Sequence, residues 1–380
     1  MPGALDNLRI LDFSRVLAGP FATMTLGDLG AEVIKVERPR IGDETRAWGP
    51  PFDHDSGEAT YFLSVNRNKR SIALDLAADE DLRAARALAL EADVLVENFR
   101  PGVMDRLGLG YEELRTSNPR LLYCSITGFG RGEGAKLTGY DLLVQALGGL
   151  MSITGPPDGE PQKVGVALVD VLAGLFATVG ILAAARHRER TGTGQRIEVT
   201  LLGSLLAAFV NQGAAYTIAG EVPRRLGNAH PSIAPYELFE TGDGQLVIAV
   251  GNDRQFAILC EVIGSPGLAS DPRFAANADR VAHRQELRAE LEQRLARRPA
   301  QAWAEALTEA RVPAGVVNDL EAAFRLAEAL GLAPIVPVQR DDGSELLLTR
   351  NPISLSETPP EYRAPPPALP ARGDGVAHQW

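Results

Sequence analysis

A long apolar stretch over residues 164–185, VGVALVDVLAGLFATVGILAAA, constrains the fold of this chain more than any other segment. Asp170 is its only charged residue and Thr178 its only other polar one. An unpaired, ionised carboxylate in apolar surroundings loses several kcal/mol of hydration, or its pKa rises until it becomes neutral. We therefore expect Asp170 to have a partner or a chemical task, and it is the leading candidate for a catalytic residue.

Two structural interpretations of this stretch compete with a catalytic one. Its length suits a membrane span, which needs ~20 apolar residues, but it contains three glycines and an Asp in its first third, and nothing else in the chain looks membranous. The other interpretation is an ordinary buried helix with Asp170 as its N-cap, because an Asp before a long apolar run is typical of capping. Capping does not exclude chemistry, since a residue at a helix start can face a cleft.

Composition and charge describe an ordinary two-domain globular protein. A chain of 380 residues exceeds what one hydrophobic core normally serves, and 45% apolar with 23% charged residues allows a large core. The formal net charge of -11, without a Lys/Arg-rich run, argues against nucleic acid and anionic membrane surfaces as partners. The N-terminal residues lack a charged start followed by an apolar core, so we expect no secretory signal and a cytoplasmic protein.

Few residue groups suit a metal ion. Cys124 and Cys260 are the only cysteines and lie far apart in the sequence, which excludes a disulfide framework and a CxxC metal site. Asp53, His54 and Asp55 lie together, but no other His or Cys supplies ligands at a recognisable spacing. We therefore predict a solvated loop at this position and no metal site.

The N-terminal region predicts the start of a doubly wound α/β sheet. Residues 8–13, 20–29 and 33–37 have the patterns of a strand, a helix and a strand, which together form a βαβ unit. Glu37 ends the second strand, where a ribose-binding acid lies in a dinucleotide fold. The turn after the first strand reads SRVLAGP, however, and lacks the GxGxxG pattern, so nicotinamide binding is disfavoured.

Changes in composition divide the chain into three parts. A large α/β domain is predicted over residues 1–220, and a linker-like segment leads into a small α+β domain over residues 225–330. Hairpins are expected around Asp243-Gly244 and Asp342-Gly343, where apolar runs flank an Asp-Gly turn. Residues 331–380 are predicted to return to the large domain and pack on it, because their proline-rich tail cannot fold alone.

Two segments of the large domain suggest a site for an anion. Arg67, Lys69 and Arg70 place three cations within four residues of an acidic protein, which indicates either a phosphate site or a solvated basic turn. Residues 128–134, GFGRGEG, are rich in glycine, but no Lys-Ser/Thr pair follows, so they do not form a nucleotide P-loop. We expect them to form a flexible loop that lines a cleft.

Four long segments resemble the class III CoA-transferase family, which includes formyl-CoA transferase: LDFSRVLAGPFATMTLGDLGAEVIKVERP, NRNKRSIALDL, ENFRPGVMDRLGLGYEELRTSNPRLLYCSITGFG and GVALVDVLAGL. The likeness runs to about residue 360, whereas the tail ending in GVAHQW departs from the commoner ending. The resemblance implies a nucleophilic aspartate at Asp170. It also implies a Rossmann-like large domain with a small α+β domain, in a homodimer of two interlocked rings. Its Coenzyme A site would comprise Arg38, Asn98, Phe99, Arg106 and Tyr140.

The chemistry that this resemblance implies suits a carboxylate. With an ordinary pKa of ~3.9, Asp170 would be ionised at neutral pH and would need no separate base to attack a thioester. The attack would give an aspartyl-acyl anhydride and CoA thiolate, which returns to form an aspartyl-CoA thioester, and an incoming acid then takes the CoA. Backbone N–H groups near residues 128–134 would stabilise the oxyanion. A CoA thioester is the expected substrate, and no tightly bound cofactor is expected.

Two other functions stay open at this point. α-Methylacyl-CoA racemases share the implied fold and move a proton with a His-Asp pair, where this chain has Tyr140 and Asp141. A tyrosine with a reference pKa of ~10 carries protons poorly at neutral pH, which disfavours a racemase. The third hypothesis is an inactive CoA-binding scaffold, and the intact Asp170 argues against it.

The acids exchanged are less well defined by the sequence. Formyl-CoA transferases carry glutamine where this chain has Leu17, and a run of glycines where it reads GNAHPSIAP. Both differences argue against formate and oxalate. The AHPSIAPY pattern is more similar to the succinyl-CoA-dependent branch, which acts on dicarboxylates. Arg15 or His230 is then the expected partner of the distal carboxylate of such a substrate.

Overall fold

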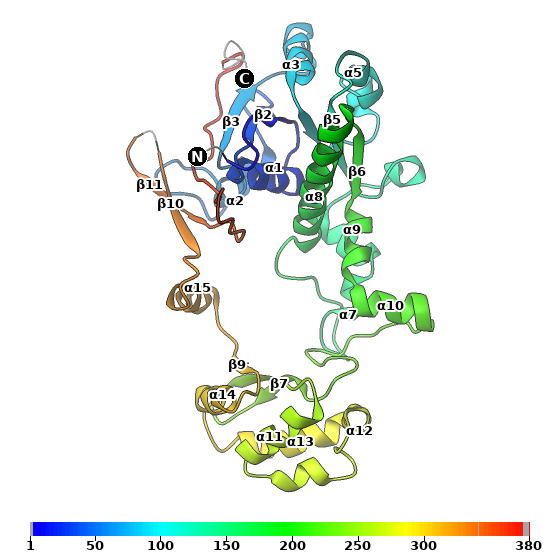
Figure 1. Ribbon diagram of the computed structural model, residues 1–380, viewed down its shortest axis with the longest axis vertical. Helices are drawn as coiled ribbons and strands as arrows, with labels where there is room; N and C mark the ends of the chain where they lie inside the picture. Colours follow the sequence, from blue (N-terminus) through cyan, green and yellow to red (C-terminus); the bar gives the residue numbers. More distant parts are fainter. Residues whose placement is uncertain (1–2, 341, 375–379) are drawn as a thin grey trace. The chain divides into compact units, whose positions relative to one another are not determined.

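A six-stranded, all-parallel β-sheet forms the centre of the larger of two structural units (Figure 1). The computed structural model describes residues 3–340, 342–374 and 380. The strand order is β3-β2-β1-β4-β5-β6, and Asp12 at the end of β1 pairs in register with Lys35 on β2 and Val96 on β4. The strands are β1 (Arg9–Asp12), β2 (Glu32–Glu37), β3 (Lys69–Ala73), β4 (Val94–Glu97), β5 (Leu122–Thr127) and β6 (Arg196–Thr200).

Helices cover both faces of this sheet. Ile10 on β1 packs in the core beneath α1, α8 and α9, whereas its neighbour Leu11 packs in the core beneath α3 and α5, and both are fully buried. A strand buried on both faces is typical of α/β proteins, which confirms the predicted α/β class of the larger unit. The helices named here are α1 (Ala18–Asp28), α3 (Asp79–Glu91), α5 (Tyr111–Ser117), α8 (Leu168–Thr191) and α9 (Leu201–Ala208).

The apolar stretch forms α8, which is a core helix of the larger unit. Its side chains at intervals of three and four residues pack against the sheet and α1: Val169, Ala173, Ala177, Ile181 and Ala184 are all buried. By length and composition alone, α8 is long and apolar enough to cross a membrane, as is the bent pair formed by α9 and α10 (Val210–Ala219) if it counts as one span. The periodic burial explains the apolar residues on one face of α8, whereas Leu175, Phe176 and Val179 lie outside that face and are exposed.

A glycine allows α8 to cross α1 closely, near the end of α8 that carries Asp170. A Cβ atom added at Gly174 would lie 2.6 Å from the backbone oxygen of Ala18, the first residue of α1. We expect Gly174→Ala to lower the free energy of unfolding by about 1–3 kcal/mol, because neither helix backbone can yield easily. Urea denaturation measures this change, and Gly267→Ala, with open space around its added Cβ, is the matched control. Equal stability of both variants would contradict the close crossing.

The apolar pattern predicts one helix over residues 140–151 and another over residues 204–219, and both are broken in the structure. The segment expected to be helical over 140–151 forms α6 (Asp141–Leu147) and α7 (Leu150–Ile153), separated by Gly148 and by Gly149, which has a φ of 90°. The segment expected over 204–219 forms α9 and α10 with a bend of 84°. The bend falls at Val210, whose φ of 44° a β-branched residue rarely adopts.

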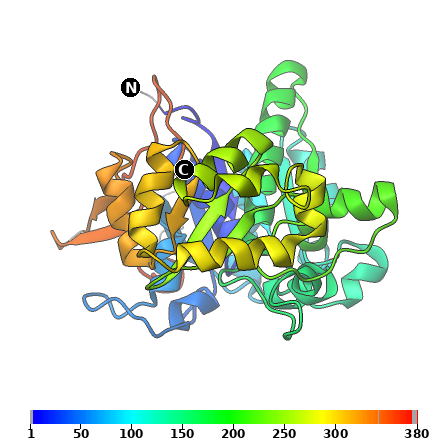
Figure 2. The ribbon, with the colours of Figure 1, turned by 90° about the horizontal axis from the view of Figure 1, so that it is seen from below.

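The smaller unit comprises Met151–Gln162 and Val222–Leu332. Its antiparallel sheet has the order β7-β8-β9, and the hairpin predicted around Asp243-Gly244 is present. Its helices between residues 277 and 295 are drawn in yellow in Figure 2, and Phe239, Phe256 and Trp303 lie in its core. The elements are β7 (Tyr236–Glu240), β8 (Gln245–Ala249), α11 (Asp253–Val262), α12 (Asn277–Ala282), α13 (Arg284–Leu295), α14 (Ala300–Glu309), β9 (Ala314–Val316) and α15 (Leu320–Ala329).

Residues 151–162 belong to this smaller unit, although the sequence placed them in the large domain. The backbone N–H of Gly227 donates to the oxygen of Gly155 at 3.1 Å. The Arg225 guanidinium binds the oxygen of Gly159 at 2.9 Å. These bonds join the segment to the chain that enters the smaller unit.

The C-terminal segment Ala333–Trp380 belongs to the larger unit. The predicted hairpin around Asp342-Gly343 is formed by β10 (Ile335–Gln339) and β11 (Glu345–Thr349). Its inner residue Val338 packs with Phe62 and Leu63 near α2 (Thr60–Ser64). The unusual end of the tail falls largely on residues 375–379, which lie outside the described residues.

Two of the three cations at residues 67–70 are structural, which argues against a phosphate site there, whereas Arg70 is exposed and pairs with Glu32 at 2.7 Å. Arg67 is buried and binds both carboxylate oxygens of Asp28, at 2.8 Å from Nε and 2.6 Å from Nη2. Lys69 is buried as well and lies 3.2 Å from the carboxylate of Asp12. Buried cations need such partners, because they have lost their hydration.

Candidate active site

A cleft of about 280 Å³ lies at the carboxyl ends of the central strands, and Asp170 forms part of its wall. The loop after β1 supplies Arg15, Val16 and Leu17, while residues beyond β4 and β5 line other sides. Open parallel sheets bind their ligands at this edge. A larger cavity of about 670 Å³ lies near Arg9 at the opposite, amino edge, but no candidate catalytic residue lines it. We therefore place the candidate active site in the smaller cleft.

Asp170 is the third residue of α8 and does not cap this helix. The N-cap position belongs to Ala167, whose side chain makes no capping bond. The cap comes instead from Asp141, whose Oδ1 accepts the backbone N–H of Val169 at 2.8 Å. The structure thus rules out the interpretation of Asp170 as the N-cap and leaves its carboxylate free for another task.

Asp141 and Gln145 form a support for the start of α8 that the sequence analysis missed. Gln145 donates from Nε2 to the second oxygen of Asp141 at 2.6 Å, and its own Oε1 accepts the backbone N–H of Val164 at 2.9 Å. Both ends of the segment that leads into α8 are therefore held by α6.

The environment of Asp170 keeps its carboxyl group partly neutral near pH 7. Burial raises its pKa to about 7, and the negative charge of Asp141 adds to the rise. Among the described residues, no hydrogen bond or ion pair satisfies this side chain. The expectation of an ordinary, fully ionised carboxylate was therefore wrong. Once ionised, such a poorly solvated carboxylate is a stronger nucleophile than one in water.

Tyr61 is a further residue near the site that the sequence did not reveal. Burial, with the negative charges of Asp170 and Asp141, raises its pKa to about 12. The phenol therefore stays protonated and keeps an O–H that can donate a hydrogen bond. Its ring packs with Leu17 and Val171 in a small apolar cluster.

The family resemblance implies a thioester substrate and Asp170 as its nucleophile, and on that basis we expect kcat/KM to rise with pH, with an apparent pKa of about 7. The raised pKa leaves Asp170 neutral below this value, and a neutral carboxyl group is a poor nucleophile. A pH–rate profile of the wild-type enzyme checks this. Asp141→Asn should move the acidic limb to lower pH, because it removes a neighbouring negative charge. A profile flat between pH 5 and 8 would contradict this account.

The loop that follows β1 and lines the cleft is held in a fixed conformation by buried polar residues. Val16 has a φ of 70°, and its backbone N–H donates to both carboxylate oxygens of Asp43 at 3.2 Å. Lys35, which is buried, binds Asp43 at 2.9 Å and the backbone oxygen of Ser14 at 2.8 Å. A non-glycine residue persists in this conformation only when its surroundings impose it. The buried pair supplies that constraint.

The structure brings five of the predicted site residues to one cleft with Asp170. Arg15, Leu17, Asn98, Phe99 and Tyr140 all line it. Asn98 also fixes the loop, since it accepts the backbone N–H of Arg15 at 2.9 Å and donates to the oxygen of Arg15 at 2.7 Å. This second role was not predicted.

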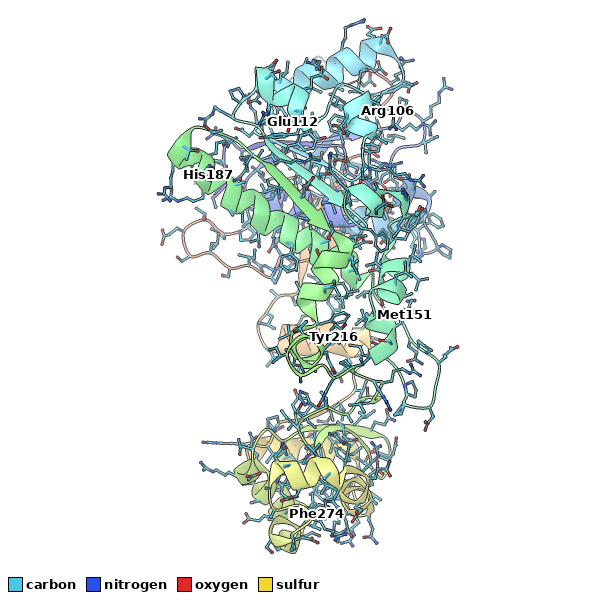
Figure 3. The ribbon with its side chains drawn as sticks, turned by 90° about the vertical axis from the view of Figure 1, so that its right-hand side faces the viewer. Arg106, Glu112, Met151, His187, Tyr216 and Phe274 are labelled. Atoms are coloured by element: carbon cyan, nitrogen blue, oxygen red, sulfur yellow. The ribbon has the colours of Figure 1, made fainter. Side chains whose placement is uncertain are left out.

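Three other predicted residues do not line this cleft. Arg38 follows β2, and Arg106 (labelled in Figure 3) ends α4 (Val103–Arg106); both are exposed, and neither side chain has an ion-pair partner among the described residues. His230 belongs to the smaller unit, where its ring lies 5.3 Å from that of Tyr236. The roles predicted for these three residues remain predictions.

The described part of the chain holds no group of three or more His, Cys, Asp or Glu side chains that could bind a metal ion. The acidic pair considered as a metal site is engaged elsewhere. Arg340 binds Asp53 at 2.7 Å and Asp55 at 3.0 Å. These ion pairs join the loop to the end of β10.

Comparison with known proteins agrees with the chemistry that the site suggests. The sequence profile of CoA-transferase family III matches residues 5–372. The chain belongs to this family. A succinate--glutarate CoA-transferase of Agrobacterium fabrum is 44% identical over 370 residues, which cover 96% of this chain and 92% of that protein. A solved structure of a CAIB/BAIF family protein from Brucella suis matches with a TM-score of 0.88 and 41% identity, over 100% of this chain and 99% of that one.

The protein is therefore a CoA-transferase, an enzyme that moves CoA between carboxylic acids. This outcome confirms the transferase prediction and disfavours the racemase and the inactive scaffold. The acids differ among its relatives. An acetyl-CoA:oxalate CoA-transferase of Acetobacter aceti is 41% identical over 381 residues, covering 100% of this chain and 96% of that protein. Overall identity alone thus does not define the acid that this family III enzyme uses.

Proposed function

We propose that this enzyme transfers CoA from succinyl-CoA to a dicarboxylic acid, with Asp170 as the nucleophile. The observation that carries the proposal is the placement of Asp170, in the first turn of α8, on the wall of the cleft and without a partner among the described residues. A carboxylate needed only for structure would be expected to have a hydrogen-bonding partner. One that reacts must have its oxygen atoms accessible.

The reaction would proceed through two covalent intermediates. The ionised Asp170 attacks the thioester carbonyl carbon, the C–S bond breaks, and CoA leaves as the thiolate, which gives an aspartyl-acyl anhydride. The thiolate then attacks the aspartyl carbonyl and expels the first acid as its carboxylate, leaving an aspartyl-CoA thioester. The second acid reverses these steps: its carboxylate attacks the aspartyl carbonyl, CoA is expelled as the thiolate, and the thiolate attacks the acyl carbonyl and restores free Asp170.

Coenzyme A would lie along the carboxyl edge of the sheet. Asn98, Phe99 and Tyr140 line the cleft, and Arg100 lies beside them. Arg38 and Arg106 are exposed cations that follow β2 and end α4, so they are suited to the phosphate groups. A net charge of -11 makes such local cations necessary for an anionic ligand. No tightly bound cofactor is needed, because the thioester supplies the driving force.

A dicarboxylic acid as acceptor is supported by two observations. The Agrobacterium fabrum relative is named for succinate and glutarate. Leu17 lines the cleft where formyl-CoA transferases carry a glutamine, so an apolar wall faces the acyl chain. A chain of several methylene groups suits this wall better than formate does.

We also propose the Rossmann-like large domain, as the strand order supports, and the interlocked homodimer. α10 has no fully buried residue, with Val210 at 74% and Ile218 at 85% of full exposure, and Tyr216 (Figure 3) lies on the same helix. Such apolar faces normally contact another chain, and a second copy of this chain is our proposed partner. Light scattering tests this assembly, and a monomer would contradict it. We propose a cytoplasmic location as well, and the net charge of -11 argues against nucleic acid and anionic membrane surfaces as partners.

Mass spectrometry of the Asp170 peptide tests the proposed chemistry. After incubation with succinyl-CoA, acetyl-CoA or oxalyl-CoA and rapid quenching, we expect CoA attached to this peptide by a thioester, and most of it with succinyl-CoA. Hydroxylamine should remove the adduct, because it cleaves activated acyl groups. Transfer activity without any adduct would show that the two substrates react directly with each other, and would overturn the assignment of Asp170.

A further inference from the structure

Arg15 forms an ion pair with Glu44 in the wall of the cleft that also contains Asp170. Its Nη1 lies 2.5 Å from Oε1 of Glu44, in the short helix η1 (Glu44–Ala47). Its guanidinium lies 5.1 Å from the centre of the Phe99 ring. Arg15, Glu44 and Phe99 all line the cleft. Since Asn98 clamps the backbone of Arg15, the base of this side chain is fixed while its charged end faces the cleft.

The pair between Arg15 and Glu44 is easy to open. The two side chains are 44% and 41% exposed, and an ion pair at such a position contributes only about 0–1 kcal/mol. The second oxygen of Glu44, Oε2, is buried without a partner among the described residues. A buried acceptor without a donor costs free energy, which is recovered when the side chain turns outward into water.

Other cations near this loop cannot exchange partners so readily. Lys35 and Asp43 form a pair with fully buried side chains, and Arg46 binds Glu37 at 2.7 Å with little exposure of either group. Breaking pairs of this kind leaves an uncompensated buried charge. Glu44 therefore differs from these acids. Its carboxylate occupies the position at Arg15 that the carboxylate of a substrate could take.

We infer that Arg15 binds the distal carboxylate of the acid substrate, and that Glu44 is an internal competitor that this carboxylate displaces. The inference rests on the proposed function and identifies the pair that selects diacids. A guanidinium accepts a carboxylate through two parallel hydrogen bonds, whereas Glu44 reaches it with one oxygen only. A monocarboxylate brings no second charge, so it leaves the pair intact and gains nothing from Arg15.

Acceptor kinetics with glutarate and valerate test this inference, because the two acids have the same number of carbon atoms and differ in the distal carboxylate. In the proposed double-displacement mechanism, kcat/KM for the acceptor reports only the reaction with the CoA-loaded enzyme, so an effect on the donor does not interfere. Arg15→Met should lower kcat/KM for glutarate about 30- to 100-fold and leave the value for valerate within about twofold. Glu44→Gln should raise kcat/KM for glutarate about 2- to 5-fold without changing that for valerate.

The exposed pair of Arg115 and Glu112 on α5 supplies matched controls. Arg115→Met and Glu112→Gln should leave both acids unaffected. Equal losses for glutarate and valerate in Arg15→Met would overturn the inference and indicate that Arg15 holds CoA or the loop. A lower value for glutarate in Glu44→Gln would overturn the competitor role, even if Arg15→Met did not fold.

Different results would refute the proposed chemistry and this inference. If Asp170 is not the nucleophile, wild-type enzyme forms no CoA adduct. If only the inference is wrong, the wild type and both cleft variants still form the adduct on the Asp170 peptide, while the preference for glutarate over valerate stays unchanged.

Discussion

Asp170→Asn is expected to lower kcat for CoA transfer from succinyl-CoA to glutarate at least about 10⁴-fold. The amide has nearly the shape of the carboxylate but has no negatively charged oxygen to attack the thioester, and loss of a nucleophile removes most of the rate acceleration. Chromatographic assay of glutaryl-CoA measures the loss. The CoA adduct on the peptide should disappear as well. Activity above about 1% of the wild type would mean that another group performs the attack.

The same substitution should stabilise the protein at high pH. The raised pKa of Asp170, about 7 against a reference of 3.8, means that the folded state disfavours the ionised form. The resulting loss of stability is absent below pH 4, develops as the pH rises, and is complete above pH 7. We expect Asp170→Asn to unfold with about 1–3 kcal/mol more free energy than the wild type at pH 8, and with no such gain at pH 4.

Urea denaturation at both pH values measures this difference. Asp158→Asn is a suitable control, because Asp158 is exposed and its side chain has no ion-pair partner in the described part of the chain. Equal stability of Asp170→Asn and wild type at pH 8 would contradict the buried, partly neutral carboxyl group. The two measurements together would show that the enzyme gives up stability to keep a reactive group in its cleft.

Asp28→Ala is expected to cause the second large effect, on stability. Asp28 is almost fully buried and accepts hydrogen bonds from Arg67, Asn68 and Asn351, which come from two distant parts of the chain. Its removal leaves the buried Arg67 guanidinium without its carboxylate, which costs about 3–5 kcal/mol. Chemical denaturation measures this loss, and Glu112→Ala, from an exposed ion pair, should cost about 0–1 kcal/mol.

The same variant should loosen the C-terminal segment. Proteolysis under native conditions is expected to cut after Arg350 or Arg363 faster in Asp28→Ala than in the wild type, because Asn351 loses its partner. If the variant were as stable as the wild type, the attraction between Asp28 and Arg67 would only offset the free-energy cost of desolvating the two groups.

Local patterns predicted the elements that form the sheet and its edge. The βαβ unit at the N-terminus and both Asp-Gly hairpins were predicted from periodicity and turn chemistry, and the structure confirms them. Asn98 and Tyr140 were assigned to a common site through the family resemblance, and the cleft brings both together with Asp170. Parallel strands place their carboxyl ends at one edge, which explains why residues so distant in sequence meet there.

Pairings between distant polar residues could not be predicted. Asp141 caps a helix that begins 27 positions later, at Leu168. Arg67 and Asp28 are 39 positions apart, and their pairing makes a basic segment structural that looked like an anion site. Sequence periodicity indicates which face of a helix or strand is buried, but it does not indicate which buried charged residues form a pair. The raised pKa of Asp170 follows from such three-dimensional surroundings and was missed for the same reason.

The return of the C-terminal segment to the larger unit has a consequence for synthesis on the ribosome. The β10–β11 hairpin completes the apolar cluster around Phe62 and Leu63, and Asn351 completes the surroundings of Asp28. These contacts form only after the smaller unit has been translated. Until then, the apolar side chains around Phe62 and Leu63 lack their packing partners in the nascent chain. A chaperone that covers exposed apolar surface would be of most use during this part of elongation.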